Sequence, residues 1–301
     1  MAIGMVIVAM LGLVFMAIFQ NKNYNYDRII IYGQDNDGQT FSLVLESSRS
    51  EVFAGLYEHF YTVDILYKDE VYRDYIQKSK IGASIQNIGF LNNFRYRSAL
   101  DKTSESYDFK IDIKNINLQV AIPKLESDFL VKNSLTDFRY ISSSVAAVQV
   151  GDQKFNAHVM TDRVISTDFL KMATLEQTKL VTSSMALWDE SGNYYHIDIT
   201  KVKSSNANYQ SHTWILYKDA RTNSTSKIFE GSIHATKFDQ NTPKQVTITI
   251  PKLNNTKISL VSDWVLSHRN FDTVQTVLGQ VIDIDGEREI SGYYHFIDNT
   301  K

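Results

Sequence analysis

Apolar and polar residues alternate one by one through most of this chain after residue 26, and this alternation restricts the folds available to it. Runs such as "TFSLVL", "YYHIDITKV" and "VTITI" are rich in Val, Ile, Thr and aromatic residues, with Asn, Asp, Gly and Ser between them. Successive side chains of a strand point to opposite faces of its sheet, so a period of two buries one face. Only three prolines occur in 301 residues, which leaves room for long strands. The chain is predicted to be all-β and antiparallel.

Three signatures occur twice and in the same order, which predicts an internal duplication. They are DNDGQTFSL and DESGNYYHI (35–43 and 189–197), AIPKL and TIPKL (121–125 and 249–253), and VQVGDQKFNAH and IDIDGEREISGYY (148–158 and 282–294). A length of 301 residues suits two domains of about 150 residues each. We expect two tandem β-domains, residues 21–172 and 173–301.

The first half is longer than the second between its first two signatures, and a helix is the predicted cause. Asp35 and Ile122 are 87 positions apart, whereas Asp189 and Ile250 are 61 apart. Ser48 and Glu51 fit a capping box, and helical spacing follows at Phe53, Leu56, Tyr57, Phe60, Tyr61 and Ile65. A pair of twisted strands is the alternative, because Tyr, Phe and Val also suit sheets. We expect a helical insertion within 49–78.

The chain begins with an apolar run that is long enough to cross a membrane. Ala2–Phe19 is 18 residues without charge or proline, and as a helix it would reach about 27 Å. No basic residue precedes it and no good small-x-small cleavage pattern follows, which favours an uncleaved anchor over a signal peptide. Residues 1–20 are therefore predicted to form a transmembrane helix.

The side of the membrane on which the body lies is predicted from two opposing signals. Lys22 and Arg28 follow the apolar run, and basic residues there favour a cytoplasmic body. A short anchor that carries an all-β body is more typical of extracytoplasmic proteins. We expect an extracytoplasmic body on a single-pass N-terminal anchor.

Composition excludes several classes of function. The chain has a net charge of −3 without clustered Lys and Arg, so a nucleic-acid partner is not expected. It has no cysteine, which excludes disulfides, thiolate catalysis and cysteine-ligated metals. The sequence has no G-x-S-x-G, H-E-x-x-H, P-loop or G-x-G-x-x-G motif. No cofactor and no metal site are expected.

Two groups of polar residues in predicted strands are candidates for chemistry. In FNAHVMTDRVIS (155–166), His158 and Asp162 share a strand face but lie about 13 Å apart, too far for a hydrogen bond. Asp162 is either a single buried acid with a raised pKa or a surface residue. His196 and Asp198 share a face with Tyr194, and the simplest prediction is that this face meets solvent; no third metal ligand lies nearby.

The duplicated layout resembles the lipocalin-like hydrolase group of bacteria, which includes the carotenoid 1,2-hydratases. Asp162-Arg163 matches the family's Asp followed by His, Gln or Arg, and ISGYYHF (290–296) is similar to its Gly-x-Gly-Tyr run. Met160 stands where the family has an aromatic residue, and Ile165-Ser166 replaces its Trp-Gly. The resemblance implies two stacked lipocalin-like barrels with a pocket for a polyene, lipid or similar ligand, and Asp162 as proton donor.

Three functions compete on these grounds. The first is a membrane-anchored lipocalin-like protein that binds a hydrophobic small molecule or lipid, with ligand-binding residues His158, Trp188, Trp264, His268 and Tyr294. The second is a hydratase or hydrolase with Asp162 as general acid. The third is a non-enzymatic envelope scaffold. An apolar cavity of a few hundred Å³ inside a barrel would favour the first.

Overall fold

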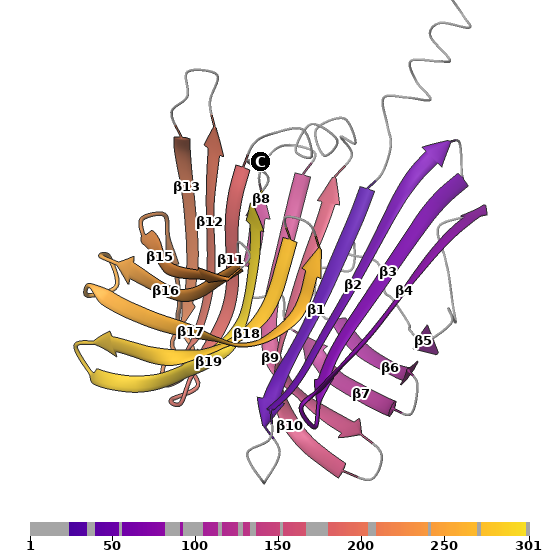
Figure 1. Ribbon diagram of the computed structural model, residues 1–301, viewed down its shortest axis with the longest axis horizontal. Helices are drawn as coiled ribbons and strands as arrows, with labels where there is room; N and C mark the ends of the chain where they lie inside the picture. Colours follow the sequence, from indigo (N-terminus) through magenta and orange to yellow (C-terminus); the bar gives the residue numbers. More distant parts are fainter. Residues whose placement is uncertain are drawn as a thin grey trace, which may run out of the picture. The chain divides into compact units, whose positions relative to one another are not determined.

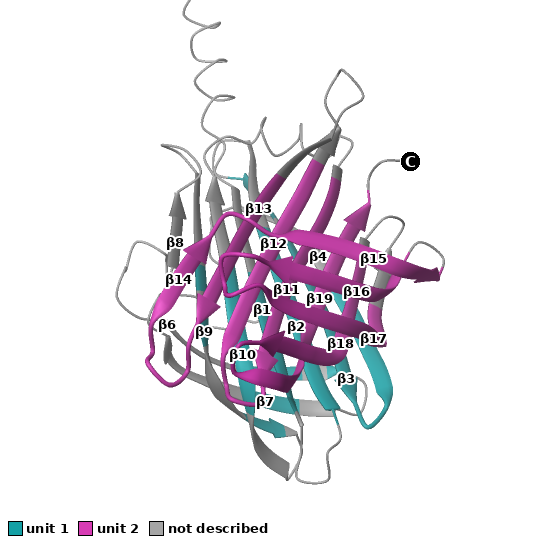
Figure 2. Cartoon of the chain, turned by 90° about the vertical axis from the view of Figure 1, so that its left-hand side faces the viewer, with its two compact units in different colours: residues 1–175 teal, residues 176–301 magenta. Residues whose placement is uncertain are grey.

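The computed structural model of the chain is all-β and antiparallel (Figure 1). It describes residues 24–34, 40–53, 56–81, 91–92, 105–113, 116–125, 129–132, 137–150, 153–166, 180–203, 209–239, 242–269 and 272–298. Within these ranges there is no helix, and so none that is long and apolar enough to span a membrane. The predicted anchor, residues 1–20, lies outside the described residues. The chain divides into two compact units, residues 1–175 and 176–301 (Figure 2).

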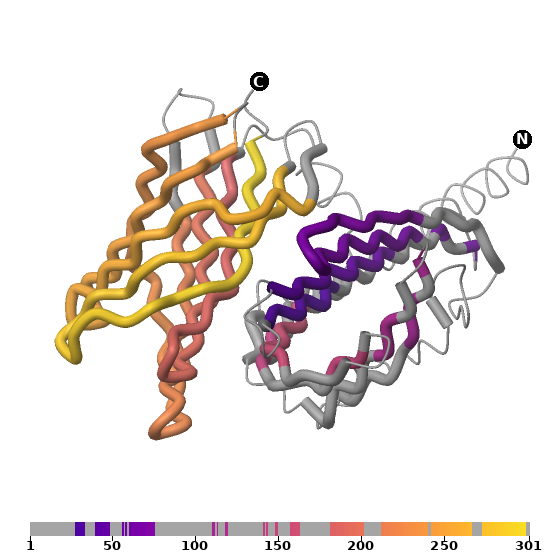
Figure 3. Tube along the Cα trace, turned by 60° about the horizontal axis from the view of Figure 1, so that its bottom comes forward, coloured from indigo at the N-terminus to yellow at the C-terminus, as the bar shows by residue number. Residues whose placement is uncertain are grey.

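The first unit contains one antiparallel sheet. Its strands are β1 (Tyr24–Gln34), β2 (Thr40–Phe53), β3 (Leu56–Tyr67), β4 (Glu70–Ile81), β5 (Leu91–Asn92), β6 (Glu105–Ile113), β7 (Ile116–Leu125), β8 (Phe129–Lys132), β9 (Asp137–Val150) and β10 (Gln153–Ser166). Their order across the sheet is β4-β3-β2-β1-β10-β9-β7-β6-β5, and β8 also pairs with β9. In Figure 3 the strands β1–β4 form one wall of this unit, and segments of β6 and β7 lie across from it.

The second unit contains a nine-stranded antiparallel sheet. Its strands are β11 (Leu180–Asp189), β12 (Tyr194–Lys203), β13 (Tyr209–Lys218), β14 (Thr225–Ile228), β15 (Ser232–Asp239), β16 (Thr242–Ile250), β17 (Thr256–Arg269), β18 (Asp272–Asp283) and β19 (Gly286–Asp298). The order is β14-β13-β12-β11-β19-β18-β17-β16-β15. Strands β15–β18 run across β11–β13, so the sheet curls over itself (Figure 2).

The curled sheet of the second unit is a half-barrel, whereas the family resemblance implied a lipocalin-like barrel. Its end strands β14 and β15 do not pair with each other in the described part of the chain. Instead, the Thr213 hydroxyl of β13 donates a hydrogen bond of 3.3 Å to the carbonyl of Gly231, which precedes β15. A side chain thus bridges an edge that the backbone leaves open.

The two sheets share one strand order. In each, four successive strands lead from one edge inward, and the first strand of the unit pairs with its last, β1 with β10 and β11 with β19. The first and third repeated signatures fall at matching hairpins. The second does not, because AIPKL ends β7, which pairs with β6 and β9, whereas TIPKL begins at the end of β16, which pairs with β15 and β17. The similarity of these short segments is therefore not a structural equivalence.

The helical insertion expected within 49–78 is wrong, since this segment belongs to strands β2, β3 and β4. Tyr61, Val63 and Ile65 alternate into the core of the first unit, with a period of two. Ser48 and Glu51 do not cap a helix but pair across β2 and β3 with Phe60 and Tyr57. β-Branched and aromatic residues pack well on a pleated surface, and here that packing overrides the helical spacing.

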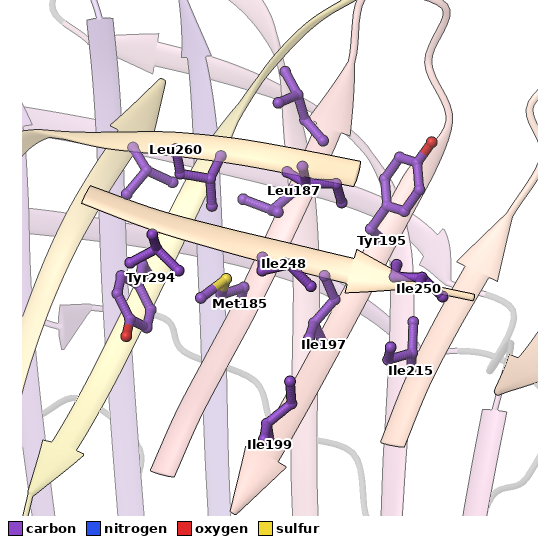
Figure 4. Packing of buried hydrophobic residues seen from close by; sticks show 14 of the residues in the cluster. Met185, Leu187, Tyr195, Ile197, Ile199, Ile215, Ile248, Ile250, Leu260 and Tyr294 are labelled. Atoms are coloured by element: carbon purple, nitrogen blue, oxygen red, sulfur yellow. The ribbon is translucent and has the colours of Figure 1, made fainter. Parts of the chain in front are cut away.

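Each unit has its own apolar core on one face of its sheet. Burying one such Leu or Ile side chain stabilises the folded state by about 1.5–3 kcal/mol. Burial of these residues therefore favours a sheet that curls over its apolar face. The core of the first unit is Ile29, Ile31, Phe41, Leu43, Leu45, Tyr61, Val63, Ile65, Ile111, Ile113, Leu118, Val148, Ala157 and Val159. Figure 4 shows the core of the second unit, to which Met185, Leu187, Ile197, Ile248 and Leu260 contribute from four strands.

Candidate functional site

A pocket of about 320 Å³ opens on the core side of the second half-barrel. Its walls come from β11, β12, β15 and β19, and most of them are apolar. The residues that line it are Val181, Ser183, Ile199, Lys201, Ile233, His234, Ala235, Phe238, Tyr294, Phe296 and Asp298. Pockets for small molecules typically begin at about 300 Å³ and combine apolar walls with a few polar groups. This pocket fits that description at the lower end of the size range.

Strand pairing places the lining residues in successive rows along the pocket. Tyr294 lies opposite Met185 in the innermost row, and Ser183 lies opposite Phe296 in the next. Val181 lies opposite Lys201 and Asp298 in the outer row. Rows on one face are about 6.6 Å apart, because two residues separate them. The polar groups of the lining are therefore divided between an inner end and the mouth.

Two hydroxyl groups form the polar inner part of the pocket. The Ser183 and Tyr294 hydroxyl oxygens are 3.1 Å apart and share a hydrogen bond, and Tyr294 is fully buried. Burial raises the pKa of the Tyr294 phenol, and the hydrogen bond from Ser183 offsets only part of that effect. The phenol is therefore uncharged at neutral pH. In Figure 4, Tyr294 stands at one end of the core with its hydroxyl directed away from it.

The mouth of the pocket is polar and is bordered by an edge strand. Lys201 and His234 are exposed there, and Asp298 is half-buried. Strand β15 supplies Ile233 and Ala235 to the wall, and its pairing with β16 shifts register after Ala235. Bulges of this kind bend an edge strand. Beyond the bulge, Phe238 lines the pocket yet remains 55% exposed.

The opposite face of the same sheet carries a hydrogen-bonded chain of three side chains. The Tyr194 hydroxyl lies 3.3 Å from Nδ1 of His196, and Nε2 of His196 lies 3.1 Å from a carboxylate oxygen of Asp198. The prediction that this face meets solvent is wrong for His196, which is fully buried. The rings of Trp214 and Tyr194 lie beside the imidazole. No group of three potential metal ligands occurs among the described residues.

The hydrogen bonds indicate which atoms of Tyr194, His196 and Asp198 donate and which accept. A carboxylate accepts hydrogen bonds, so Asp198 favours the tautomer of His196 that carries its proton on Nε2. Nδ1 is then the acceptor for the Tyr194 hydroxyl. A tyrosine, a histidine and an aspartate in this order can pass a proton, because each donor faces an acceptor.

Asp162 and His158 lie in the first unit, on β10, and point away from its core. Their neighbours Ala157 and Val159 belong to the core, so the two polar residues lie on the other face. Asp162 is 3% exposed and stands opposite Arg28 in the register of β1 and β10. Side chains that are directly opposite have Cβ atoms about 5 Å apart. Asp162 is thus a buried carboxyl with Arg28 as its neighbour across the strand pair.

Near Asp162, Arg28 takes part in an ion pair and His158 is partly buried. Arg28 donates a hydrogen bond of 2.9 Å to Glu46, whose carboxylate also accepts one of 3.3 Å from Thr62. Burial lowers the pKa of His158, so its imidazole is uncharged at neutral pH. The strand keeps His158 and Asp162 four residues apart on one face, and they form no dyad.

The other predicted ligand-binding residues are spread over the second unit. Tyr294 lines the pocket. Trp188 lies on the opposite face, where its ring is 5.3 Å from that of Tyr194. Trp264 lies where β17 shifts register, and its backbone N–H donates to the Thr276 hydroxyl at 3.1 Å. The backbone of His268 pairs with Thr273, and its side chain is outside the described part of the structure.

Sequence reasoning missed Ser183 and the part of the wall that β15 supplies. A signal for Ser183 was available, because Val181, Met185 and Leu187 show which positions of this strand face inward. A serine at such a position interrupts the apolar alternation. The contribution of β15 has no comparable signal, since it depends on how the far end of the sheet curls back.

Comparisons with known proteins support the fold and leave the function open. No family model matches the chain, and no curated protein matches its sequence. The crystal structure of the AttH-like protein NE1406 from Nitrosomonas europaea aligns with a TM-score of 0.60 and 12% identity, covering 93% of each chain. That of kievitone hydratase from Nectria haematococca aligns with a TM-score of 0.48 and 12% identity, covering 92% of this chain and 89% of the other. The first likeness supports the lipocalin-like fold that the sequence predicts.

Proposed function

We propose that the protein binds a small hydrophobic molecule in the pocket of its second unit. The observation that carries this proposal is an apolar pocket of about 320 Å³ with a buried hydroxyl pair at its inner end. Apolar walls supply affinity, and a few fixed polar groups supply orientation. A lipocalin-like fold suits this role, because such sheets curl around the space in which a ligand lies.

A filled pocket tests the proposal directly. Ala235→Phe places a ring in the pocket wall, and Ser232→Phe places the same ring on the exposed face of the same strand. Titration with the neutral fluorescent probe N-phenyl-1-naphthylamine should show binding to the wild type and to Ser232→Phe. We expect Ala235→Phe to bind at least about tenfold more weakly, with an unchanged melting temperature. Equal binding by the two variants would refute the pocket as the site.

Native mass spectrometry of the purified protein offers a second measurement. A co-purified hydrophobic molecule that is absent from Ala235→Phe would support the proposal, because the variant removes space without removing a polar contact. Solvent extraction would then identify the molecule.

We further propose that residues 1–20 anchor the protein in a membrane, with its body on the extracytoplasmic side. The support is the uncharged run Ala2–Phe19. Deletion of residues 2–20 should move the protein from the membrane fraction to the soluble fraction. Protease added outside intact cells or spheroplasts should degrade the full-length body, and protection of the body would place it on the cytoplasmic side.

A common origin of the two units by duplication is also part of the proposal. It is supported by the shared strand order and by two repeated signatures that fall at matching hairpins. A scaffold role has less support, since a pocket of this kind serves no purpose in it.

An enzyme of the hydratase or hydrolase type is the second candidate function. The observation that favours it is the chain of Tyr194, His196 and Asp198, whose order suits general acid–base catalysis. It ranks second because Tyr194 and His196 are buried, and the pocket of about 320 Å³ is lined by the other face of the sheet. If Tyr194, His196 and Asp198 are catalytic, His196→Gln should abolish turnover in an alkene hydration assay. Loss with Asp162→Asn instead would assign the acid to Asp162.

A further inference from the structure

We infer that the ligand of this pocket is a compact apolar molecule with one uncharged hydroxyl or carbonyl group at its inner end. This inference rests on the proposed function and adds the chemical class of the ligand. Its basis is the layout of polar groups, in which the hydroxyls of Ser183 and Tyr294 lie inside and the ionisable groups lie at the mouth.

The hydroxyl pair has one hydrogen-bond donor to offer. Two hydroxyl groups carry two O–H donors, and the bond between Ser183 and Tyr294 uses one of them. The second donor therefore remains for an oxygen of the ligand. A buried donor without an acceptor is unfavourable, so an apolar ligand without an oxygen should bind more weakly than one that has an oxygen.

An ionised group does not suit the inner end of the pocket. Along the strands, Tyr294 is four residues and Ser183 is two residues from the row of Lys201, or about 13 and 6.6 Å. An anion beside Tyr294 would lose its hydration and would face only uncharged hydroxyls there. The desolvation penalty of a buried carboxylate exceeds the gain from one hydrogen bond.

The volume of the pocket sets the size of the ligand. A closed cavity of about 150 Å³ holds one benzene molecule, so 320 Å³ holds a molecule of about two rings, and a further group can extend through the open mouth. A long polyene, which the family resemblance implied, would leave most of its length outside this space. The pocket thus favours a molecule the size of a bicyclic aromatic or a small terpenoid.

Three matched probes test the inference on the unmodified protein. Naphthalene, 2-naphthol and 2-naphthoate share one apolar body and differ in a hydrogen, an uncharged hydroxyl and a carboxylate that is ionised at neutral pH. Their dissociation constants follow from displacement of N-phenyl-1-naphthylamine at neutral pH. We expect 2-naphthol to bind about 3- to 10-fold more tightly than naphthalene, the effect of one hydrogen bond, and 2-naphthoate to bind most weakly.

The double substitution Ser183→Ala/Tyr294→Phe locates the effect within the pocket, because either hydroxyl alone would still offer one donor. It should remove the advantage of 2-naphthol and leave the affinity for naphthalene within about twofold, since both hydroxyl groups are lost and the ring stays. Tyr217→Phe is the matched control, because its ring packs against Tyr195 and does not line the pocket. An advantage of 2-naphthol that survives in the folded double variant would overturn the inference.

The probe series separates failure of the inference from failure of the proposed function. Binding of naphthalene and 2-naphthol with equal affinity, or tightest binding of 2-naphthoate, would overturn the ligand class and leave the pocket as a binding site. Absence of binding by all three probes and by N-phenyl-1-naphthylamine would overturn both. The probe series is measured on the wild type, so it tests the inference even if the double variant does not fold.

Discussion

Gly292 is a residue at which the second sheet depends directly on the absence of a side chain. Its φ is +153°, and a Cβ built there would lie 2.2 Å from the carbonyl oxygen of Ala186 on the neighbouring strand. A carbonyl that is held in a ladder has little room to move away. This close approach gives the glycine of the ISGYYHF motif a structural reason, apart from any ligand.

We therefore expect Gly292→Ala to lower the free energy of unfolding by about 2–4 kcal/mol, through backbone strain and overpacking. Gly231→Ala is the control, because a Cβ there would meet the terminal methyl group of Ile215, which can rotate. Urea denaturation measures both variants, and the control should lose less stability. An equal loss in both variants would contradict a special role for Gly292.

An ion-pair network holds the D-x-x-G turn that begins at Asp189. The buried Asp189 carboxylate accepts hydrogen bonds from the backbone of Ser191 and Asn193 and from Arg288, at 2.9–3.0 Å. The two guanidinium nitrogens of Arg288 donate to both oxygens of Asp283, at 3.1 and 2.5 Å. The turn thus links β11 and β12 to the hairpin of β18 and β19. The signature that suggested a repeat is also a structural clamp.

The network predicts a pH dependence of stability. The hydrogen bonds from Arg288 hold the pKa of Asp283 below its ordinary value, so folding favours the ionised carboxylate. A pKa that is lowered in the folded state gives stability above the unfolded-state pKa of about 4, and this stability is lost as the pH falls below it.

We expect Asp283→Asn to destabilise the protein at pH 7 and to differ less from the wild type as the pH falls below about 4. Urea denaturation across this range measures the difference. Asp239→Asn is the control, because Asp239 is exposed and its nearest lysine nitrogen is 3.9 Å away. A gap between Asp283→Asn and the wild type that stays constant down to pH 3 would contradict the assignment.

Among the elements, β3 shows most clearly what a strand contributes to the first unit. Ile65 is fully buried in its core, whereas Tyr75 on the neighbouring β4 is 66% exposed. Ile65→Ala should lower the free energy of unfolding by about 2–4 kcal/mol, because it leaves a cavity. Tyr75→Ala should cost less than about 1 kcal/mol. Circular dichroism during urea denaturation measures both, and a larger loss for Tyr75→Ala would contradict the strand assignment of this segment.

The same strands show where sequence reasoning succeeds and where it fails. The alternation of apolar and polar residues correctly predicted strands β12 and β16, because in each of them the alternation is complete within a few residues. In β3 the aromatic residues satisfied helical and strand spacing at once, and only pairing with β2 and β4 decides between them. That pairing is a non-local property of the chain, and a local pattern cannot contain it.

The candidate site likewise depends on non-local contacts that a local sequence pattern does not contain. Alternation places Tyr194, His196 and Asp198 on one face, but it does not reveal that His196 on this face is buried. Tyr294 was a predicted ligand-binding residue and belongs to ISGYYHF, the run that is similar to the last-strand motif of the family. Its partner Ser183 is 111 positions away in the sequence, and the pairing of the unit's first and last strands brings them together.

At the scale of the whole molecule, the two units have separate cores and one unit holds every tryptophan. The two core clusters share no residue, and each lies within one unit. Trp188, Trp214 and Trp264 are the three tryptophans of the sequence, and all belong to residues 176–301. Tryptophan fluorescence therefore reports the second unit, whereas far-ultraviolet circular dichroism reports both.

This division predicts that substitutions in the two cores separate the two signals. Ile65→Ala should lower the denaturation midpoint of part of the dichroism signal and leave the fluorescence midpoint unchanged, because its cavity lies in the first core. Gly292→Ala should lower the fluorescence midpoint, because its strain lies in the second sheet. In the wild type, the fluorescence and dichroism signals should then have different denaturation midpoints, as expected for two cooperative units with their own cores. Coincident shifts of both signals in both variants would instead show that the chain unfolds as one unit.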